Sequence, residues 1–387
     1  MINIPYSMPE ITNSDIKRVT SVLKNGYLTQ GKEIISFESA ITDEFNCKYS
    51  MVCNSGTAAL HLAYSSLQIG PKNGLLTSPI TFLATANAAK MCNAKVVFCD
   101  VDEVTGLMTP EKIEKAILAS KIHIKVISVV HLGGRVCDME AISQIAKKYN
   151  CYLVEDASHA AGAFYNNSNP VGCCKYSDAT TFSFNAIKHI AMGEGGCVTT
   201  NNKLIAEEII KKRSHGMVKN KEEFLSKLHN NAPWYYEMQY LGWNYRADEM
   251  SCALGLSQLK RLKKNIKKRN TLADFYFKYL SGINHLNLPL KNDYLNNNAW
   301  HLFPINIDFN KLKLSREKLM KELAYKGIGT QVHYIPLYLQ PYYKQKNIKK
   351  YEGASEYYEK TLSIPLHTKL KKEDIIFISK NIRNILK

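Results

Sequence analysis

Residues 178–200 read DATTFSFNAIKHIAMGEGGCVTT, a pattern that predicts two buried strands joined by a tight turn. Residues 179–184 are rich in Thr and Phe, and residues 197–200 form a second β-rich run. Between them lies Lys188, with glycines at 193, 195 and 196. A lysine in a desolvated turn is a candidate nucleophile, because burial favours the neutral amine. A surface loop with one of many lysines fits these residues equally well, so both interpretations stay open at this point.

The run SFNAIKHIAMGEGG, residues 183–196, resembles the lysine segment of the DegT/DnrJ/EryC1/StrS sugar aminotransferases. That resemblance implies pyridoxal phosphate as the cofactor, the fold of aspartate aminotransferase, and Lys188 as the catalytic residue that binds the cofactor covalently. Some members of the family lack this lysine and act as dehydratases. This chain keeps it.

Composition and length indicate a folded protein with a large core. The chain has 387 residues, of which 45% are hydrophobic and 22% charged, and this length predicts two domains. No apolar run is long enough to cross a bilayer, residues 1–30 show no signal-peptide pattern, and the ten cysteines lack disulfide-type spacing. We therefore expect a cytoplasmic protein with reduced thiols, without membrane association, and we assign no metal-binding residues.

The formal net charge of +17 raises the question of a nucleic-acid partner. The densest basic run, KRLKKNIKKR at residues 260–269, reads as a solvated helix face. No nucleic-acid-binding signature accompanies it, so we do not assign such a partner. A general positive field would also attract a nucleotide-sugar diphosphate.

The N-terminal segment begins extended, because prolines at positions 5 and 9 oppose a helix there. Asn13 or Ser14 is then expected to cap a helix that ends at Gly26. The apolar positions expected to share one face of this helix are Ile16, Val19, Val22 and Leu23. The family resemblance extends to Tyr6 and to the run Gly26, Tyr27, Leu28 and Thr29, and it implies that these residues face the sugar nucleotide.

Residues 51–67, MVCNSGTAALHLAYSSL, predict a strand, a turn and a helix. The first amides of such a helix favour an anion. Ser-Gly-Thr alone is weak evidence for a phosphate site. With the family resemblance it implies that Gly56 and Thr57 hold the cofactor phosphate together with Ser183. In SPITFLATANAA, Phe82 matches the ring that stacks on the cofactor, although the residues alone favour an ordinary core Phe on a helix.

Residues 94–156 alternate between apolar strands and helical periods, which predicts a mostly parallel sheet covered on both faces. Sites in such sheets gather at the carboxyl ends of strands. Asp156 ends one predicted strand, where it can pair with a protonated pyridine nitrogen. The resemblance implies that role for Asp156 and places His159 beside the cofactor. Glu155 should point to the opposite face of the sheet.

The segment LGWNYR at residues 241–246 resembles a family motif, with Trp243 where a smaller aromatic is usual. The resemblance implies a homodimer with shared active sites, in which Asn244 binds the cofactor phosphate of the partner subunit and Arg246 lies near its substrate. Residues 219–236 have no counterpart in the family, and we interpret them as a variable loop or lid. The run HLGG at residues 131–134 also departs from the YG-containing run of relatives.

The C-terminal part, from about residue 298, predicts a smaller α+β domain. It contains a strand at 300–308, a helix at 315–327, a strand at 329–338 and a closing helix from about Lys371. The run GIGTQVHYIPLYLQPYY resembles the segment that lines the sugar-nucleotide site in transaminases of pseudaminic-acid synthesis. This implies substrate-binding roles for His333, Tyr334 and Tyr338.

Together these features predict an α/β protein of PLP-dependent fold type I, with a seven-stranded sheet. We expect a large domain at residues 1–255 and a small domain at 256–387. The resemblance implies transfer of an amino group from glutamate to a UDP-linked 4-keto-6-deoxy-N-acetylhexosamine, as in pseudaminic-acid synthesis. Two alternatives stay open: another 4-keto sugar nucleotide, such as the GDP-linked precursor of perosamine, and a regulatory relative that binds the cofactor without turnover.

Overall fold

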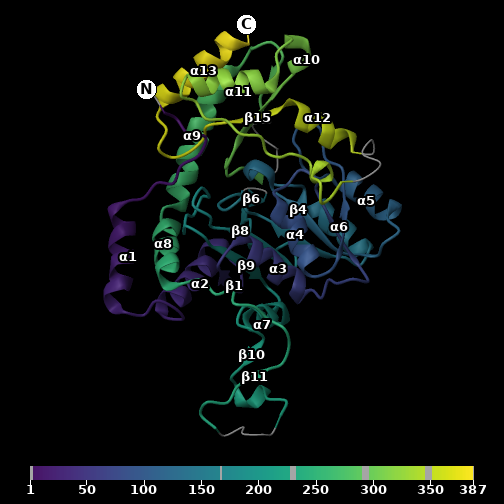
Figure 1. Ribbon diagram of the computed structural model, residues 1–387, viewed down its shortest axis with the longest axis vertical. Helices are drawn as coiled ribbons and strands as arrows, with labels where there is room; N and C mark the ends of the chain where they lie inside the picture. Colours follow the sequence, from purple (N-terminus) through teal and green to yellow (C-terminus); the bar gives the residue numbers. More distant parts are fainter. Residues whose placement is uncertain (1–2, 166–167, 227–231, 290–295, 345–350, 387) are drawn as a thin grey trace.

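The computed structural model describes residues 3–165, 168–226, 232–289, 296–344 and 351–386. Its centre is a seven-stranded sheet of order β1-β9-β8-β5-β4-β2-β3 (Figure 1). The strands are β1 (Tyr49–Cys53), β2 (Gly74–Thr77), β3 (Lys95–Phe98), β4 (Ile124–Val130), β5 (Tyr152–Asp156), β8 (Ala179–Ser183) and β9 (Gly196–Thr200). Strand β9 runs antiparallel to β1 and β8, and the other pairs are parallel. The predicted α/β fold with a mostly parallel sheet is confirmed.

Helices cover both faces of this sheet because successive strand residues point to opposite sides. One face packs against α2 (Lys32–Phe45), α5 (Pro110–Ala119), α6 (Met139–Lys148) and α8 (Glu249–Leu259). The other packs against α3 (Gly56–Ser66), α4 (Leu83–Met91) and α7 (Lys203–Lys212). Neighbouring residues divide accordingly: Val52 belongs to the first core and Met51 to the second. Both faces of the sheet are therefore buried, as the apolar runs predicted.

The C-terminal part has its own apolar core, to which residues between Leu272 and Leu386 contribute. Its sheet consists of β12 (Leu286–Asn287), β14 (Phe303–Ile307) and β15 (Thr361–Ile364). Its helices are α9 (Leu262–Leu280), α10 (Phe309–Leu312), α11 (Arg316–Tyr325), α12 (Glu352–Lys360) and α13 (Lys372–Ile385). Helix α9 runs from the body into this part (Figure 1). The division at residues 255 and 256 stays a prediction, since Leu337 and Tyr357 pack into the core of the large sheet.

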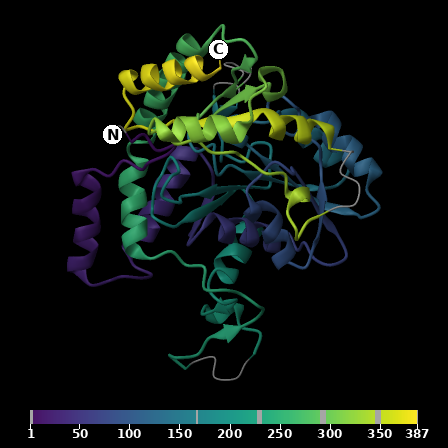
Figure 2. The ribbon, with the colours of Figure 1, turned by 45° about the horizontal axis from the view of Figure 1, so that its top comes forward.

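Short elements complete the fold. A three-stranded sheet joins β13 (Asn296–Asn297), β6 (Phe164–Tyr165) and β7 (Asn169–Pro170). In the part of the chain that the structure describes, the short 3-10 helices are η1 (Leu132–Gly134), η2 (Lys221–Glu223) and η3 (Leu337–Leu339). Strands β10 (Met217–Val218) and β11 (Glu237–Met238) form an arm that projects from the body (Figures 1 and 2). Of the segment 219–236, which was predicted to be a loop or lid, residues 227–231 lie outside the described residues.

The predicted cap of the first helix is wrong. Helix α1 (Asn13–Asn25) is capped by Thr12 rather than by Asn13 or Ser14, and Asp15 completes a capping box. Of the apolar positions predicted to share one face, Val22 is buried, whereas Ile16 and Leu23 are more than half exposed. Helix α1 lies beside α8 (Figures 1 and 2).

The predicted strand at residues 329–338 does not form. This segment makes only an isolated bridge between Gln331 and Ser363, and it ends in η3. Pro336 lacks a backbone N–H for a strand ladder. Among the described residues, no helix is long and apolar enough to cross a membrane.

Candidate active site

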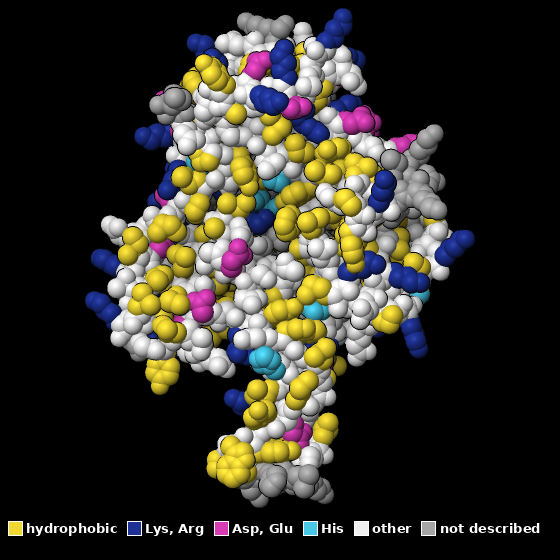
Figure 3. All heavy atoms as spheres, in the orientation of Figure 1, with side chains coloured by type: hydrophobic (Ala, Val, Ile, Leu, Met, Phe, Trp, Pro, Cys, Tyr) yellow, Lys and Arg dark blue, Asp and Glu magenta, His cyan; other side chains and the backbone are white. Residues whose placement is uncertain are grey.

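A cavity of about 580 Å³ opens at the carboxyl ends of the central strands. The last residues of β4, β5 and β8, which are Val130, Asp156 and Ser183, line it. Figure 3 shows a hollow near the centre of one face, with histidine and a Lys or Arg side chain at its bottom. This is the place where an open α/β sheet is expected to bind ligands.

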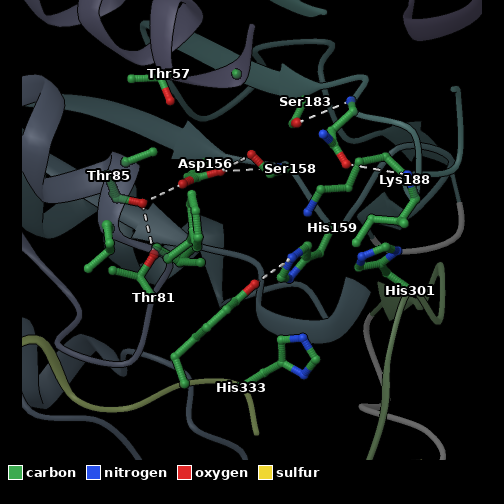
Figure 4. A pocket seen from close by; sticks show the side chains of 18 of the residues that line it. Thr57, Thr81, Thr85, Asp156, Ser158, His159, Ser183, Lys188, His301 and His333 are labelled. Atoms are coloured by element: carbon green, nitrogen blue, oxygen red, sulfur yellow. Dashed lines mark hydrogen bonds between the residues drawn. The ribbon is translucent and has the colours of Figure 1, made fainter. Parts of the chain in front are cut away.

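Lys188 lies on the turn between β8 and β9, as predicted, and its side chain reaches the cavity (Figure 4). The turn is held by backbone hydrogen bonds from Lys188 N to Asn185 O (2.9 Å) and from Met192 N to Phe184 O (2.8 Å). Gly193 adopts a φ of 83° there, a value that disfavours residues with a Cβ. Burial lowers the pKa of Lys188 to about 8, although the Asp156 carboxylate opposes this shift. The amine is therefore neutral in a substantial fraction of molecules near pH 8.

Hydrogen bonds hold both oxygens of Asp156. The Thr85 hydroxyl donates to Oδ2 at 2.6 Å, while the Ser158 hydroxyl and N–H donate to Oδ1 at 2.6 and 3.1 Å. Thr81 Oγ1 lies 2.8 Å from Thr85 Oγ1 (Figure 4). Because Thr85 donates to the carboxylate, Thr81 must donate to Thr85. Asp156 is thus fixed in its direction and accepts hydrogen bonds, as an ionised carboxylate does.

The N-terminus of α3 provides backbone amides at another wall of the cavity. Ser55 caps the helix by accepting from Ala58 N at 3.1 Å, and Gly56 and Thr57 line the cavity. A Cβ on Gly56 would lie 2.8 Å from Ser183 Cβ, closer than real Cβ contacts. Only glycine therefore lets the helix approach β8 this closely. Helix N-termini with free amides bind phosphate and other anions.

Aromatic and histidine side chains form the remaining walls. Phe82, the N-cap residue of α4, is 58% exposed, so it is not the ordinary core Phe that its own sequence context favoured. His159 and His301 stack with ring centroids 4.5 Å apart, and His333 lies below them in Figure 4. Burial lowers the pKa of His333 to about 3, and it lowers the pKa values of His159 and His301 well below the ordinary value. The charge of Lys188 lowers all three pKa values further. These imidazoles are neutral at pH 7.

Many of the residues proposed from the sequence meet in this cavity. Those that line it are Tyr6, Gly56, Thr57, Phe82, Asp156, His159, Ser183, Lys188, His333 and Tyr334. The residues proposed for the partner's site and for the substrate loop lie outside it: Gly26, Tyr27, Leu28, Thr29, Asn244 and Arg246. Glu249 N donates to Leu28 O at 2.9 Å, so the run 26–29 lies beside the start of α8, which follows Arg246 in the chain.

The structure does not place Tyr338 in the cavity. Its side chain is 1% exposed, stacks on Tyr351 and lies 2.9 Å from Ser355 Oγ through its hydroxyl. The expectation of a substrate contact fails because Leu337 and Tyr338 turn into the core within η3. Packing of this loop into the core therefore accounts for the position of Tyr338.

Sequence reasoning missed several cavity residues, of which the most informative are Thr81, Thr85, Ser158 and His301. Ser158 follows Asp156 by two residues, so its local hydrogen bond could have been expected. Thr85 and His301 belong to segments that only the fold brings to Asp156 and His159. A single sequence gives no local signal for such contacts.

Comparison with known proteins identifies the family. Residues 9–383 match the DegT/DnrJ/EryC1/StrS aminotransferase family. The chain belongs to this family. It is an aminotransferase, so the alternative of a non-catalytic relative is set aside.

The similarity of this aminotransferase to individual members covers nearly the whole chain. It is 39% identical over 384 residues to the UDP-4-amino-4,6-dideoxy-N-acetyl-beta-L-altrosamine transaminase of Campylobacter jejuni, covering 99% of this chain and 97% of that one. It matches the structure of Helicobacter pylori PseC, an aminotransferase in the biosynthesis of pseudaminic acid, with a TM-score of 0.90, 30% identity and 99% coverage of both chains. The PLP form of the sugar aminotransferase Spr1654 from Streptococcus pneumoniae matches with a TM-score of 0.89 and 27% identity, over 99% of this chain and 98% of that one. The whole fold, rather than one motif, is therefore shared.

The cavity of this aminotransferase fits pyridoxal phosphate, the cofactor that the family implies. Lys188 supplies an amine of lowered pKa, Asp156 a fixed carboxylate and α3 a helix N-terminus, and all three converge on the cavity. Gly56 and Thr57, in the first turn of α3, line the cavity together with Ser183, where a phosphate can meet the helix amides. The exposed ring of Phe82 offers a flat apolar surface for an aromatic ring.

Proposed function

We propose that this aminotransferase uses pyridoxal phosphate to transfer an amino group from glutamate to carbon 4 of a UDP-linked 4-keto-6-deoxy-N-acetylhexosamine. The observation that carries the proposal is the convergence of Lys188, Asp156 and the N-terminus of α3 on one cavity. The similarity to the Campylobacter jejuni transaminase over nearly the full length supports the choice of sugar.

The chain's own residues would divide the work as follows. Bound pyridoxal phosphate supplies the electron sink and carries the amino group between the two substrates. Lys188 would attach the cofactor and then move a proton at the reacting carbon, a role that its pKa of about 8 suits. Asp156 would keep the ring nitrogen protonated. Gly56, Thr57 and Ser183 would hold the phosphate.

Substrate contacts would come from the C-terminal part and the N-terminal arm. His333 and Tyr334 line the cavity, and Tyr6 lies beside His333 with ring centroids 5.8 Å apart. His333 Nδ1 lies 2.8 Å from Ser363 Oγ, which fixes the ring. These neutral polar groups suit the hydroxyls of a sugar.

We also propose a cytoplasmic enzyme that acts on small molecules.

We propose a homodimer in which each subunit completes the other's site. Asn244 and Arg246 do not line the cavity of their own chain, and Asn244 is exposed. Tyr27 and Leu28, in the run that lies beside the start of α8, are exposed as well, at 75% and 43%. Figure 3 shows further hydrophobic side chains on the projecting arm, where Trp234 is 74% exposed. Such a surface is typical of an interface, since monomers rarely leave large apolar patches uncovered.

A panel of keto sugar nucleotides tests the substrate. The purified enzyme with pyridoxal phosphate and glutamate is incubated with UDP-linked and GDP-linked 4-keto sugars, and the aminated carbon is identified by NMR. We expect the UDP-linked 4-keto-N-acetylhexosamine to react fastest, with the new amine at carbon 4. Preference for a GDP-linked sugar would instead support the perosamine-type alternative, and amination at another carbon would contradict the assignment.

A further inference from the structure

The turn after β4 makes an unusual contact with the cavity wall. In η1, Gly133 N donates a hydrogen bond to His159 Nδ1 at 3.2 Å. The turn is anchored on β5, because His131 N donates to Asp156 O at 3.1 Å and the His131 ring lies 2.7 Å from Glu155 Oε2. Gly134 O accepts from Ala299 N at 2.9 Å. The amide that faces His159 is therefore rigidly placed.

This contact determines which nitrogen of His159 carries the proton. Nδ1 accepts from a backbone N–H, so a neutral His159 must carry its proton on Nε2. A second proton on Nδ1 would bring two N–H groups face to face. Burial and the charge of Lys188 also lower the pKa of His159 well below its ordinary value. His301, stacked at 4.5 Å, limits rotation of the ring.

The protonated nitrogen points at Tyr334. His159 Nε2 lies 3.2 Å from the Tyr334 hydroxyl. A dashed line in Figure 4 marks this contact at the labelled His159. Because Nε2 carries the proton, the hydroxyl accepts this hydrogen bond, and its own hydrogen is left for another acceptor. Tyr334 lines the cavity, and burial, reinforced by the charge of Asp156, raises its pKa. The hydroxyl therefore keeps its hydrogen across the neutral pH range.

We propose that Gly133 and His159 act as positioning residues that make Tyr334 an obligatory hydrogen-bond donor to a lone-pair oxygen of the bound substrate. The inference rests on the proposed function. Two oxygens have the required chemistry, an oxygen of the keto sugar and a carboxylate oxygen of glutamate. The ammonium group of glutamate, which has only donors, would not be matched by this hydroxyl.

The first test examines the tautomer without any reaction. Nitrogen NMR of the enzyme labelled with 15N-histidine is recorded at pH 7.5, and His159 is assigned by the signals that disappear in His159→Gln. The exposed His123→Gln variant shows how an unrelated loss changes the spectrum. We expect a neutral ring with its proton on Nε2. A proton on Nδ1, or an imidazolium, would overturn the proposal even if the enzyme is fully active.

The second test uses two substitutions that differ in reach. The side chain of His159→Asn can still meet Gly133 N but ends short of Tyr334, whereas that of His159→Gln can extend a donor to the tyrosine. Each half-reaction is followed separately by stopped-flow absorbance. We expect Tyr334→Phe and His159→Asn to weaken one half-reaction by about 3- to 10-fold, the effect of a hydrogen bond to a neutral group. We expect His159→Gln to recover part of that loss.

The half-reaction that is affected identifies the oxygen. Loss confined to the sugar half assigns it to the keto sugar, and loss confined to the glutamate half assigns it to the carboxylate. The double variant Tyr334→Phe with His159→Asn should be no worse than Tyr334→Phe alone. Additive losses would overturn the proposal that His159 acts through Tyr334. A wild-type enzyme that aminates none of the keto sugars would count against the proposed function, while the NMR result would still decide on the tautomer.

Discussion

Asp156 shows how a single residue depends on groups that lie far away in the sequence. Its two oxygens accept from Thr85 and Ser158, and Thr81 in turn supports Thr85. The arrangement aims the carboxylate and leaves it no freedom to rotate. This is the preorganisation that an electrostatic partner of a cofactor ring requires.

We predict that Asp156→Asn lowers turnover on the order of 10²-fold, because a neutral amide cannot stabilise a protonated ring nitrogen. The folded state should persist, as judged by circular dichroism and thermal unfolding. Thr85→Val should cause a smaller loss and Thr85→Ser almost none, since serine keeps the hydroxyl. Turnover of Asp156→Asn close to that of the wild type would show that another group serves the ring nitrogen.

At the scale of elements, the N-terminus of α3 owes its position to one contact. Gly56 allows the helix to approach Ser183 without a Cβ in between. We predict that Gly56→Ala weakens binding of pyridoxal phosphate by about 10- to 100-fold, the range for a lost hydrogen bond to a charged group. A fluorescence titration measures the dissociation constant.

Gly70→Ala is the matched control for this substitution. Its added Cβ would have Cys92 O as its nearest neighbour, at 4.0 Å, so no clash is expected. Cofactor affinity should therefore match that of the wild type. Equal affinity of Gly56→Ala and Gly70→Ala would argue against a phosphate site at α3.

Helix α3 also carries a buried histidine that predicts a pH dependence of stability. Burial, with the charge of Lys212, lowers the pKa of His61 to about 4, and its Nε2 has no partner among the described residues. Between pH 6.5 and about 4 the unfolded chain binds a proton that the folded protein does not. The free energy of unfolding should therefore fall as the pH is lowered through this window.

The size of this effect can be isolated with a variant. His61 contributes at most about 1.4 kcal/mol per pH unit, and His61→Asn should flatten the pH dependence by up to that slope. Urea unfolding at several pH values measures it. The exposed His123→Asn variant serves as control and should keep the slope of the wild type. An unchanged slope in His61→Asn would show that its pKa is not lowered.

The elements were largely predictable because their signals are local. Lys188 follows a Thr- and Phe-rich strand, and Asp156 ends an apolar strand. Because both residues come at the carboxyl end of a predicted strand, the sequence places them at the same edge of a parallel sheet. Residues 329–338 have a similarly β-rich composition but make only a single bridge to β15, between Gln331 and Ser363, and Pro336 lacks the N–H that a longer ladder needs. Thr85 and His301 could not be predicted, since they reach the cavity only through tertiary packing. The burial of Tyr338 could not be predicted for the same reason.

At the scale of the whole molecule, the separation of Asn244 and Arg246 from their own cavity predicts sites shared between subunits. Lys188→Ala and Arg246→Ala should each be inactive as homodimers. In a mixed dimer, one site carries both lesions and the other carries neither. Re-equilibrated mixtures should therefore regain activity, at most about half of the wild-type value per mixed dimer.

Activity of the mixture and exchange of subunits are measured together, the latter with two distinguishable tags. A mixture of Lys188→Ala with Asp156→Asn is the control. These residues line the same cavity of one chain, so every site of their mixed dimer is defective and no activity should return. Proven exchange without rescue in the first mixture would mean that Arg246 acts within its own chain.

The most direct test of the whole account is to locate the covalent attachment of the cofactor. The enzyme is loaded with pyridoxal phosphate, reduced with borohydride, digested, and mapped by mass spectrometry. We expect the visible absorbance of the loaded enzyme to disappear on reduction and the cofactor mass to appear on Lys188 alone. Labelling of another of the chain's lysines, or of none, would contradict the assignment of this turn as the catalytic centre.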